Sequence, residues 1–372
     1  MPPGGRPDVN RRSQQIGAGE MWPPGNGPLR PIYRALVNAF WQRPMNSSTE
    51  VRITRLCSQR CRQCSIYERQ TQPPSLTFDR FRHVMDRLRQ YGAYIGFISG
   101  GEATLVPELP EMLAAAKDTF ALSTTLVTGL YNTRAVIERV GRTALELGIN
   151  IQTSLDGLGR TGDILRGVPD FAATVLDRMS LLTRLRGTSR SLLYVNVVMS
   201  AMNIEQVPEI VHRATDLGWK VTLGLYHSLT ETTRPDDALR LRPTPALRRT
   251  LDRLAASPDI LNLPSFLNGI EDFLRTGSYP ICPFVDDQYF TTRVTVMENG
   301  DVHLCWGGPI GNLFRQSLGD IFSSPTYRLR LASYRRCRGC WTTCYTQRYL
   351  LMHPRNGTEL KQNLTRVLNL RR

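Results

Sequence analysis

The chain has 372 residues, with 47 basic and 32 acidic side chains and a formal net charge of +15. Charged residues make up 21% of the chain, which is too few for a disordered polyelectrolyte, and no run of about 18 apolar residues predicts a membrane-spanning helix. The basic residues are almost all arginines spread along the chain, so we expect no nucleic-acid partner.

The first segment is rich in proline and glycine, and we expect residues 1–48 to form a mobile N-terminal extension. Apolar residues at helical spacing predict one short helix in it, over 31–41. The residues after Met1 lack the apolar core of a signal peptide, so we expect a cytoplasmic protein.

Residues 49–230 alternate between strand-like and helix-like patterns. The predicted strands are 51–55, 94–99, 123–128, 149–154, 192–199 and 220–226, and the predicted helices are 77–91, 107–118, 133–147, 168–186 and 204–217. Such alternation is typical of a parallel sheet with helices outside it. Because there are six units rather than eight, we predict an α/β fold, a partial (β/α)6 TIM-like barrel.

The alternation ends after residue 230. Residues 231–275 carry two proline-flanked helical patterns, at 245–256 and 265–275, and we interpret them as a helical bridge. Residues 276–350 are predicted to form a smaller C-terminal unit around a hairpin whose turn contains Gly300. Residues 351–372 are expected to be a tail.

Three of the eight cysteines, Cys57, Cys61 and Cys64, lie in one loop after the first predicted strand. Three thiolates at this spacing suit three irons of a 4Fe–4S cluster, whereas electron-transfer clusters generally take four cysteines. The fourth iron would be open to bind and reduce a small molecule. Zinc completed by a distant ligand is the alternative. A disulfide framework is disfavoured, because the chain is not a short secreted one.

This loop resembles the C-x3-C-x2-C signature of the radical S-adenosylmethionine (radical SAM) superfamily, and the resemblance extends over about residues 50–230. Motifs at successive strand ends follow the family's order. The resemblance implies that S-adenosylmethionine is bound by Ser99, Gly100, Gly101, Glu102, Thr128, Ser154, Asp156, Arg166 and Asn196. Glu102 would pair with the amino group of the methionine part, and Ser154 and Arg166 would hold ribose or carboxylate. Gln63 replaces the family's aromatic residue before the third cysteine, which leaves the adenine contact open.

The remaining cysteines are Cys282, Cys305, Cys337, Cys340 and Cys344. Their arrangement around the hairpin resembles the SPASM extension, or its shorter twitch form, which implies one auxiliary 4Fe–4S cluster. By resemblance, the first four are its ligands and Cys344 is left over. Three roles for Cys344 stay open: a small buried side chain, a ligand in place of Cys337 or Cys340, or a hydrogen-atom donor to a substrate radical. A zinc knuckle is the alternative.

The resemblance implies an enzyme that cleaves S-adenosylmethionine reductively to a 5′-deoxyadenosyl radical, which takes a hydrogen atom from a substrate. An electron donor such as flavodoxin or ferredoxin is then expected. Only 56 residues precede Cys57, too few for the leader-binding domain of many peptide-modifying relatives, so we expect a small natural-product or sugar-like substrate. A maturase of a ribosomal peptide or protein side chain is the alternative. A non-catalytic iron–sulfur redox or sensor protein is the alternative of another class. Oxidation, epimerisation and carbon–carbon bond formation all stay open.

Overall fold

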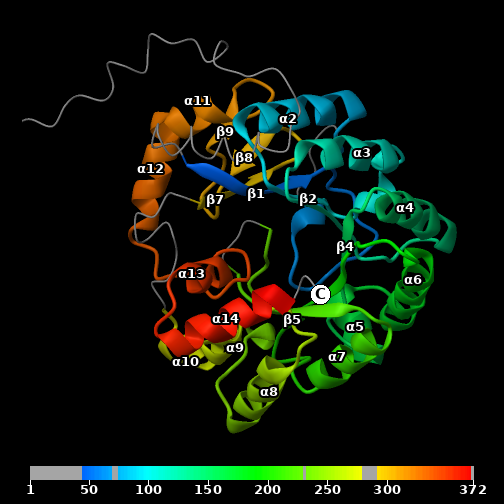
Figure 1. Ribbon diagram of the computed structural model, residues 1–372, viewed down its shortest axis with the longest axis vertical. Helices are drawn as coiled ribbons and strands as arrows, with labels where there is room; N and C mark the ends of the chain where they lie inside the picture. The colour runs from blue at the N-terminus through cyan, green and yellow to red at the C-terminus, as the bar shows by residue number, and fades with distance from the viewer. Residues whose placement is uncertain (1–43, 69–73, 229–231, 279–290, 370–372) are drawn as a thin grey trace, which may run out of the picture.

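The computed structural model describes residues 44–68, 74–228, 232–278 and 291–369, and these form a curved sheet with helices around it (Figure 1). The strands are β1 (Met45–Arg52), β2 (Ile95–Ser99), β3 (Ser123–Val127), β4 (Asn150–Ser154), β5 (Leu193–Met199), β6 (Lys220–Leu225), β7 (Thr291–Val296), β8 (Asp301–His303) and β9 (Gly311–Asn312). Their order in the sheet is β6-β5-β4-β3-β2-β1-β7-β8-β9. Strands β1 to β6 pair in parallel, and the sheet stays open. The predicted partial barrel is therefore confirmed.

Helices cover the outer side of the strands, with α3, α4, α6 and α7 along one flank in Figure 1. The α-helices are α2 (Phe78–Tyr91), α3 (Leu109–Thr119), α4 (Arg134–Glu146), α5 (Gly159–Arg166), α6 (Phe171–Arg186), α7 (Val207–Asp216), α8 (Pro245–Ala256), α9 (Pro264–Asn268), α10 (Ile270–Thr276), α11 (Leu318–Ser323), α12 (Pro325–Tyr334), α13 (Thr346–Met352) and α14 (Gly357–Asn369). Within the described ranges, none of these helices combines the length and apolarity that crossing a bilayer requires.

Helix α2 shows how the sequence pattern builds this outer layer. The hydroxyl of Thr77 accepts a hydrogen bond from the backbone N–H of Arg80 and caps the first turn. Phe81, Met85 and Leu88 recur at helical spacing and are buried against the sheet. An apolar stripe of this width favours a helix docked on a core over an isolated one.

The C-terminal hairpin is not a detached unit, because β7 continues the sheet at the edge of β1. The two strands pair in parallel, with Val51 opposite Val296. β8 and β9 then extend the sheet in antiparallel order. The predicted hairpin is present, and its β7 strand lies beside the strand that leads into the cysteine loop.

Several segments differ from the expected domain limits. β1 begins at Met45, inside the segment expected as an extension, whereas the predicted helix at 31–41 and Cys282 lie outside the described residues. The segment expected as a tail contains α14, which packs on α9, and the hydroxyl of Ser265 donates a hydrogen bond to buried Asn363 at 3.1 Å. Helices α11 and α12 carry weaker sequence signals and were not predicted.

Candidate active site

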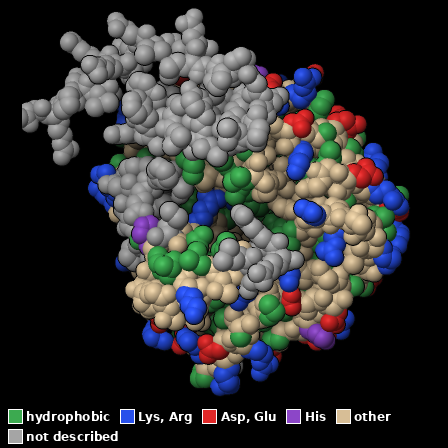
Figure 2. Space-filling view, viewed as in Figure 1, with side chains coloured by type: hydrophobic (Ala, Val, Ile, Leu, Met, Phe, Trp, Pro, Cys, Tyr) green, Lys and Arg blue, Asp and Glu red, His purple; other side chains and the backbone are tan. Residues whose placement is uncertain are grey.

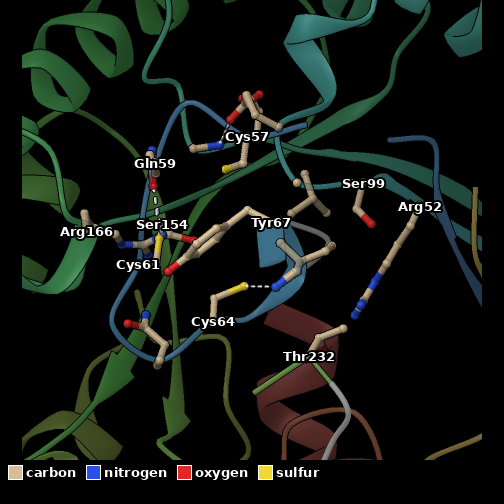
Figure 3. A pocket seen from close by; sticks show the side chains of 18 of the residues that line it. Arg52, Cys57, Gln59, Cys61, Cys64, Tyr67, Ser99, Ser154, Arg166 and Thr232 are labelled. Carbon is tan, nitrogen blue, oxygen red and sulfur yellow. Dashed lines mark hydrogen bonds between the residues drawn. The ribbon is translucent and has the colours of Figure 1, made fainter. Parts of the chain in front are cut away.

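A cavity of about 210 Å³ lies at the carboxyl ends of β1 to β4, the edge where β/α barrels carry their chemistry. Cys57, Cys61 and Cys64 all line it. Figure 3 shows their side chains on different sides of the same space. Seven of the nine residues that the resemblance assigned to the cofactor also line it, namely Ser99, Gly100, Gly101, Glu102, Thr128, Ser154 and Arg166.

Strand ends hold the backbone of the cysteine loop in place. The N–H of Glu102 donates to the carbonyl of Leu56 at 2.7 Å, and the N–H of Arg60 donates to the carbonyl of Arg166 at 3.0 Å. A Cβ on Gly101 would stand 2.3 Å from the Leu56 carbonyl oxygen, so this glycine allows the loop to approach. Gly167, at φ +63°, would place a Cβ 2.4 Å from the carbonyl oxygen of Arg60. These glycines therefore position the loop itself.

Glu102 joins the ends of β2 and β3. Its carboxylate accepts hydrogen bonds from the hydroxyls of Thr104 at 2.7 Å and Thr128 at 2.6 Å, and from the backbone N–H groups of Thr104 at 3.1 Å and Gly129 at 2.7 Å. The side chain is buried, yet it lines the cavity. Because all four donors are neutral, the carboxylate can still attract a cation, as the amino group of S-adenosylmethionine requires.

Arg166 is already engaged with a carboxylate of the protein. Its guanidinium lies 2.6 Å from Asp156, and both side chains are buried. Asp156 also accepts hydrogen bonds from the N–H of Val198 at 2.7 Å and from the amide of Gln63 at 3.0 Å. Asp156 thus ties the cysteine loop to β5.

Asp156 and Asn196 are not among the residues that line the described cavity. Asn196 lies on β5 and accepts a hydrogen bond from the Thr222 hydroxyl at 3.0 Å. Cofactor roles for these two residues stay predictions, and Asp156 acts on the site through Arg166 and Gln63.

Burial raises the pKa of two thiols in the cysteine loop. It raises the pKa of Cys57 to about 12, and it raises the pKa of Cys61 although Arg166 opposes the shift. Such thiols keep their protons until iron binds, because metal ligation takes the thiolate form and releases the proton. No three described Cys, His, Asp or Glu side chains converge as ligands of one metal ion. The fit to a larger 4Fe–4S cluster rests on three thiols lining one cavity beside Glu102.

Four cysteines of the second group are described, and no disulfide joins any two of the described cysteines. Cys340 is buried, and Cys305, Cys337 and Cys344 are partly buried. Cys344 interacts electrostatically with Arg293 on β7 and with Tyr194 on β5.

Among the cavity residues that the sequence analysis did not name, Tyr67 carries an aromatic group and Arg52 a charged one. Tyr67, in the short 3-10 helix η2 (Ile66–Glu68), brings an aromatic ring to the cavity, with the Arg60 guanidinium 4.8 Å from the ring centroid (Figure 3). Its position three residues after Cys64 is the feature of the sequence from which its place in the cavity could have been predicted. Arg52 enters from β1, and the two-residue period of a strand could have placed it on the face of Glu50.

Comparison with known proteins agrees with this geometry. Residues 51–240 match the Radical SAM superfamily, and residues 288–341 match the SPASM iron–sulfur cluster-binding domain. The pre-heme d1 synthase of Dinoroseobacter shibae is 27% identical over 209 residues, which are 55% of this chain and 49% of that protein. The sporulation killing factor maturation protein SkfB of Bacillus subtilis is 22% identical over 46% of this chain and 40% of its own length. The PqqA peptide cyclase of Bradyrhizobium diazoefficiens is 26% identical over 44% of this chain and 42% of its own length.

The chain spans about half or less of these curated relatives. Among solved structures, Streptococcus suis SuiB bound to S-adenosylmethionine has a TM-score of 0.60 at 16% identity and covers 83% of this chain and 72% of its own. The structure of anSMEcpe with S-adenosylmethionine and the Cp18Cys peptide has a TM-score of 0.59 at 14% identity and covers 87% and 98%. At these identities the structures show a shared fold. The family match covers more than half of the chain, and the protein belongs to the radical SAM superfamily, with a SPASM domain that implies an auxiliary iron–sulfur cluster.

Proposed function

We propose that this radical SAM enzyme modifies a peptide, in the simplest case a ribosomally made precursor. SkfB is named as a maturation protein and another relative as a peptide cyclase. SuiB, which shares the fold, has also been solved with its precursor peptide SuiA. These relatives favour the peptide alternative over the small-molecule substrate that the short N-terminal segment had suggested.

The cavity residues have separate roles in this proposal. Cys57, Cys61 and Cys64 would hold a 4Fe–4S cluster, which when bound would supply the one-electron chemistry that radical cleavage of S-adenosylmethionine requires. Glu102 attracts the amino group of the methionine part and orients it. Arg166, held by Asp156, keeps its positive charge beside Cys61, where its guanidinium lies 3.7 Å from the sulfur.

The C-terminal unit has a separate role in this proposal. Cys305, Cys337 and Cys340, together with Cys282 outside the described residues, would hold the auxiliary cluster. A flavodoxin or ferredoxin would deliver electrons.

The test is a mass shift in a candidate peptide. Short open reading frames next to this gene are expressed as peptides and incubated anaerobically with the purified enzyme, S-adenosylmethionine and dithionite. We expect one peptide to change mass while 5′-deoxyadenosine accumulates, and the Cys61→Ala variant to produce neither change. Deuterium transfer into 5′-deoxyadenosine from a labelled small metabolite, with every peptide unchanged, would contradict the peptide proposal in favour of a small substrate.

A further inference from the structure

Two arginines line the described cavity, and they differ in whether their two terminal nitrogens are bonded to the protein. Arg166 is paired with Asp156, and its Nη1 also lies near Gln59 and Cys61. Arg52 donates only from Nε, to Glu50 at 3.1 Å. Among the described residues its two terminal nitrogens have no hydrogen-bond partner. The side chain keeps 17% of its surface exposed, and it lines the cavity, so these nitrogens face open space.

The single negative charge of Glu50 cannot balance the positive charge around it, because two guanidinium groups are bonded to this carboxylate. Arg293 on β7 donates to the second oxygen of Glu50 at 3.0 Å, and the Ser99 hydroxyl donates to the first at 2.8 Å. These partners outweigh burial and lower the pKa of Glu50 from the usual 4.5 to about 2, so it stays ionised. Glu50 thus holds Arg52 in one orientation through a single nitrogen.

A third arginine adds to the excess of positive charge. Arg348 on α13 donates to the hydroxyls of Ser47 and Ser48 on β1, and no carboxylate among the described residues pairs with it. Glu50 is therefore the one described carboxylate bonded to this group, against three guanidinium groups. Figure 2 shows Lys or Arg atoms beside a hollow near the middle of the face in view. Buried charge of one sign is costly unless an opposite charge joins it.

Arg52, on β1, and Arg166, at the end of α5, line the same cavity and lie apart within it. In Figure 3, Arg166 lies beside Cys61, whereas Arg52 lies on the opposite side of the view, near the Ser99 label. Arg52 is paired in register with Ser99, the last residue of β2, directly before Gly100 and Gly101. A planar guanidinium with two free nitrogens matches a carboxylate through two parallel hydrogen bonds.

We infer that Arg52 binds a carboxylate of the substrate, in a peptide the side chain of Asp or Glu, at the β1 side of the cavity. The statement that the ligand is a peptide rests on the proposed function, whereas the statement that Arg52 binds a carboxylate does not. Glu50 is the positioning residue that presents the two free nitrogens. Arg166 cannot bind a substrate carboxylate in the same way, because its guanidinium is already paired with Asp156.

The test is site-specific modification of arginine by phenylglyoxal, followed by mass spectrometry of the cluster-loaded enzyme. The probes are glutarate and a matched pair of tripeptides, acetyl-Gly-Glu-Gly-amide and acetyl-Gly-Gln-Gly-amide, all with S-adenosylmethionine present. We expect Arg52 to be modified, and glutarate and the Glu peptide to slow that modification several-fold while the Gln peptide does not. Buried Arg166 is the cavity control and should stay unmodified. Exposed Arg142 on α4 should react at one rate throughout.

Each of the other possible results would contradict either the carboxylate site at Arg52 or the peptide proposal. If Arg52 is inert, or if neither carboxylate protects it, the inference is wrong and the peptide proposal is unaffected. If glutarate protects and the two peptides behave alike, the carboxylate site stands and the peptide proposal is contradicted. If S-adenosylmethionine alone protects Arg52 and its decarboxylated form does not, the cofactor's own carboxylate occupies the site. If both forms protect it, Arg52 is closed to substrate. Either of these last two results overturns the assignment.

Discussion

The Thr128 hydroxyl at the end of β3 donates a 2.6 Å hydrogen bond to the Glu102 carboxylate beyond β2. We predict that Glu102→Gln weakens S-adenosylmethionine binding roughly 10–150-fold, the loss expected for one charge-assisted pair. The new amide would also face the N–H of Gly129, which now donates to the carboxylate at 2.7 Å. Equilibrium dialysis of the cluster-loaded protein measures the affinity, with iron content measured alongside.

Thr128 supplies the matched controls for Glu102. Thr128→Ser keeps the hydroxyl and should retain affinity, whereas Thr128→Val should weaken binding by less than Glu102→Gln, because the negative charge remains. Wild-type affinity in Glu102→Gln with full iron would show that this carboxylate does not hold the cofactor.

The cysteine loop should behave as a unit. We predict that Cys57→Ala, Cys61→Ala and Cys64→Ala each abolish cleavage of S-adenosylmethionine while the auxiliary cluster is retained, because each thiolate holds one iron. Chromatography of 5′-deoxyadenosine after dithionite reduction and iron analysis measure the two properties separately. Full cleavage in any one variant would contradict the assignment of the loop.

The buried pair of Asp156 and Arg166 should matter for stability. Asp156→Asn leaves Arg166 without its countercharge, and removing one partner of a buried pair typically costs about 3–5 kcal/mol of unfolding free energy. The exposed pair of Arg142 and Glu138 on α4 is the control, and Glu138→Ala should change stability by no more than about 0.5 kcal/mol. Denaturant unfolding of the cluster-free proteins measures both. Equal effects in the two variants would argue against a buried charge pair at the loop.

Glu50 should make the free energy of unfolding depend on pH in the acid range. Its pKa is lowered from 4.5 to about 2, so its contribution is complete above pH 4.5 and is lost as the pH falls towards 2. We predict that the wild type loses on the order of 3 kcal/mol relative to Glu50→Gln across that window. Urea unfolding of both cluster-free proteins at several pH values tests this. A constant difference between them would mean that the carboxylate is not held ionised by Arg52 and Arg293.

Cys344→Ser distinguishes the three roles left open for this cysteine. A loss of about one cluster's share of iron would identify a ligand. Full iron with normal turnover would identify a bystander. Full iron and normal 5′-deoxyadenosine, but with a lost or altered product, would support hydrogen-atom donation.

Local sequence was sufficient for the parts of this protein that depend on near neighbours. The spacing of Cys57, Cys61 and Cys64 lies within one loop, and the strand–helix alternation follows from the periodicity of each segment. The predicted strands agree with β2 to β6 because a buried parallel strand is recorded in its own apolar run. The short pairing of Glu102 with Thr104 also lies within one turn.

Only the tertiary structure decided which distant residues meet. Glu50 and Arg293 are 243 positions apart, and their contact depends on β7 pairing with the edge of β1. The sequence could name Arg166 and Arg52 as cations, but not that one is paired with Asp156 and the other has free nitrogens. Strand neighbours and ion-pair partners are chosen by the packing of the whole chain. The family and its cofactors were therefore readable from local motifs, whereas the ion pairs around each arginine were fixed only when the sheet had assembled.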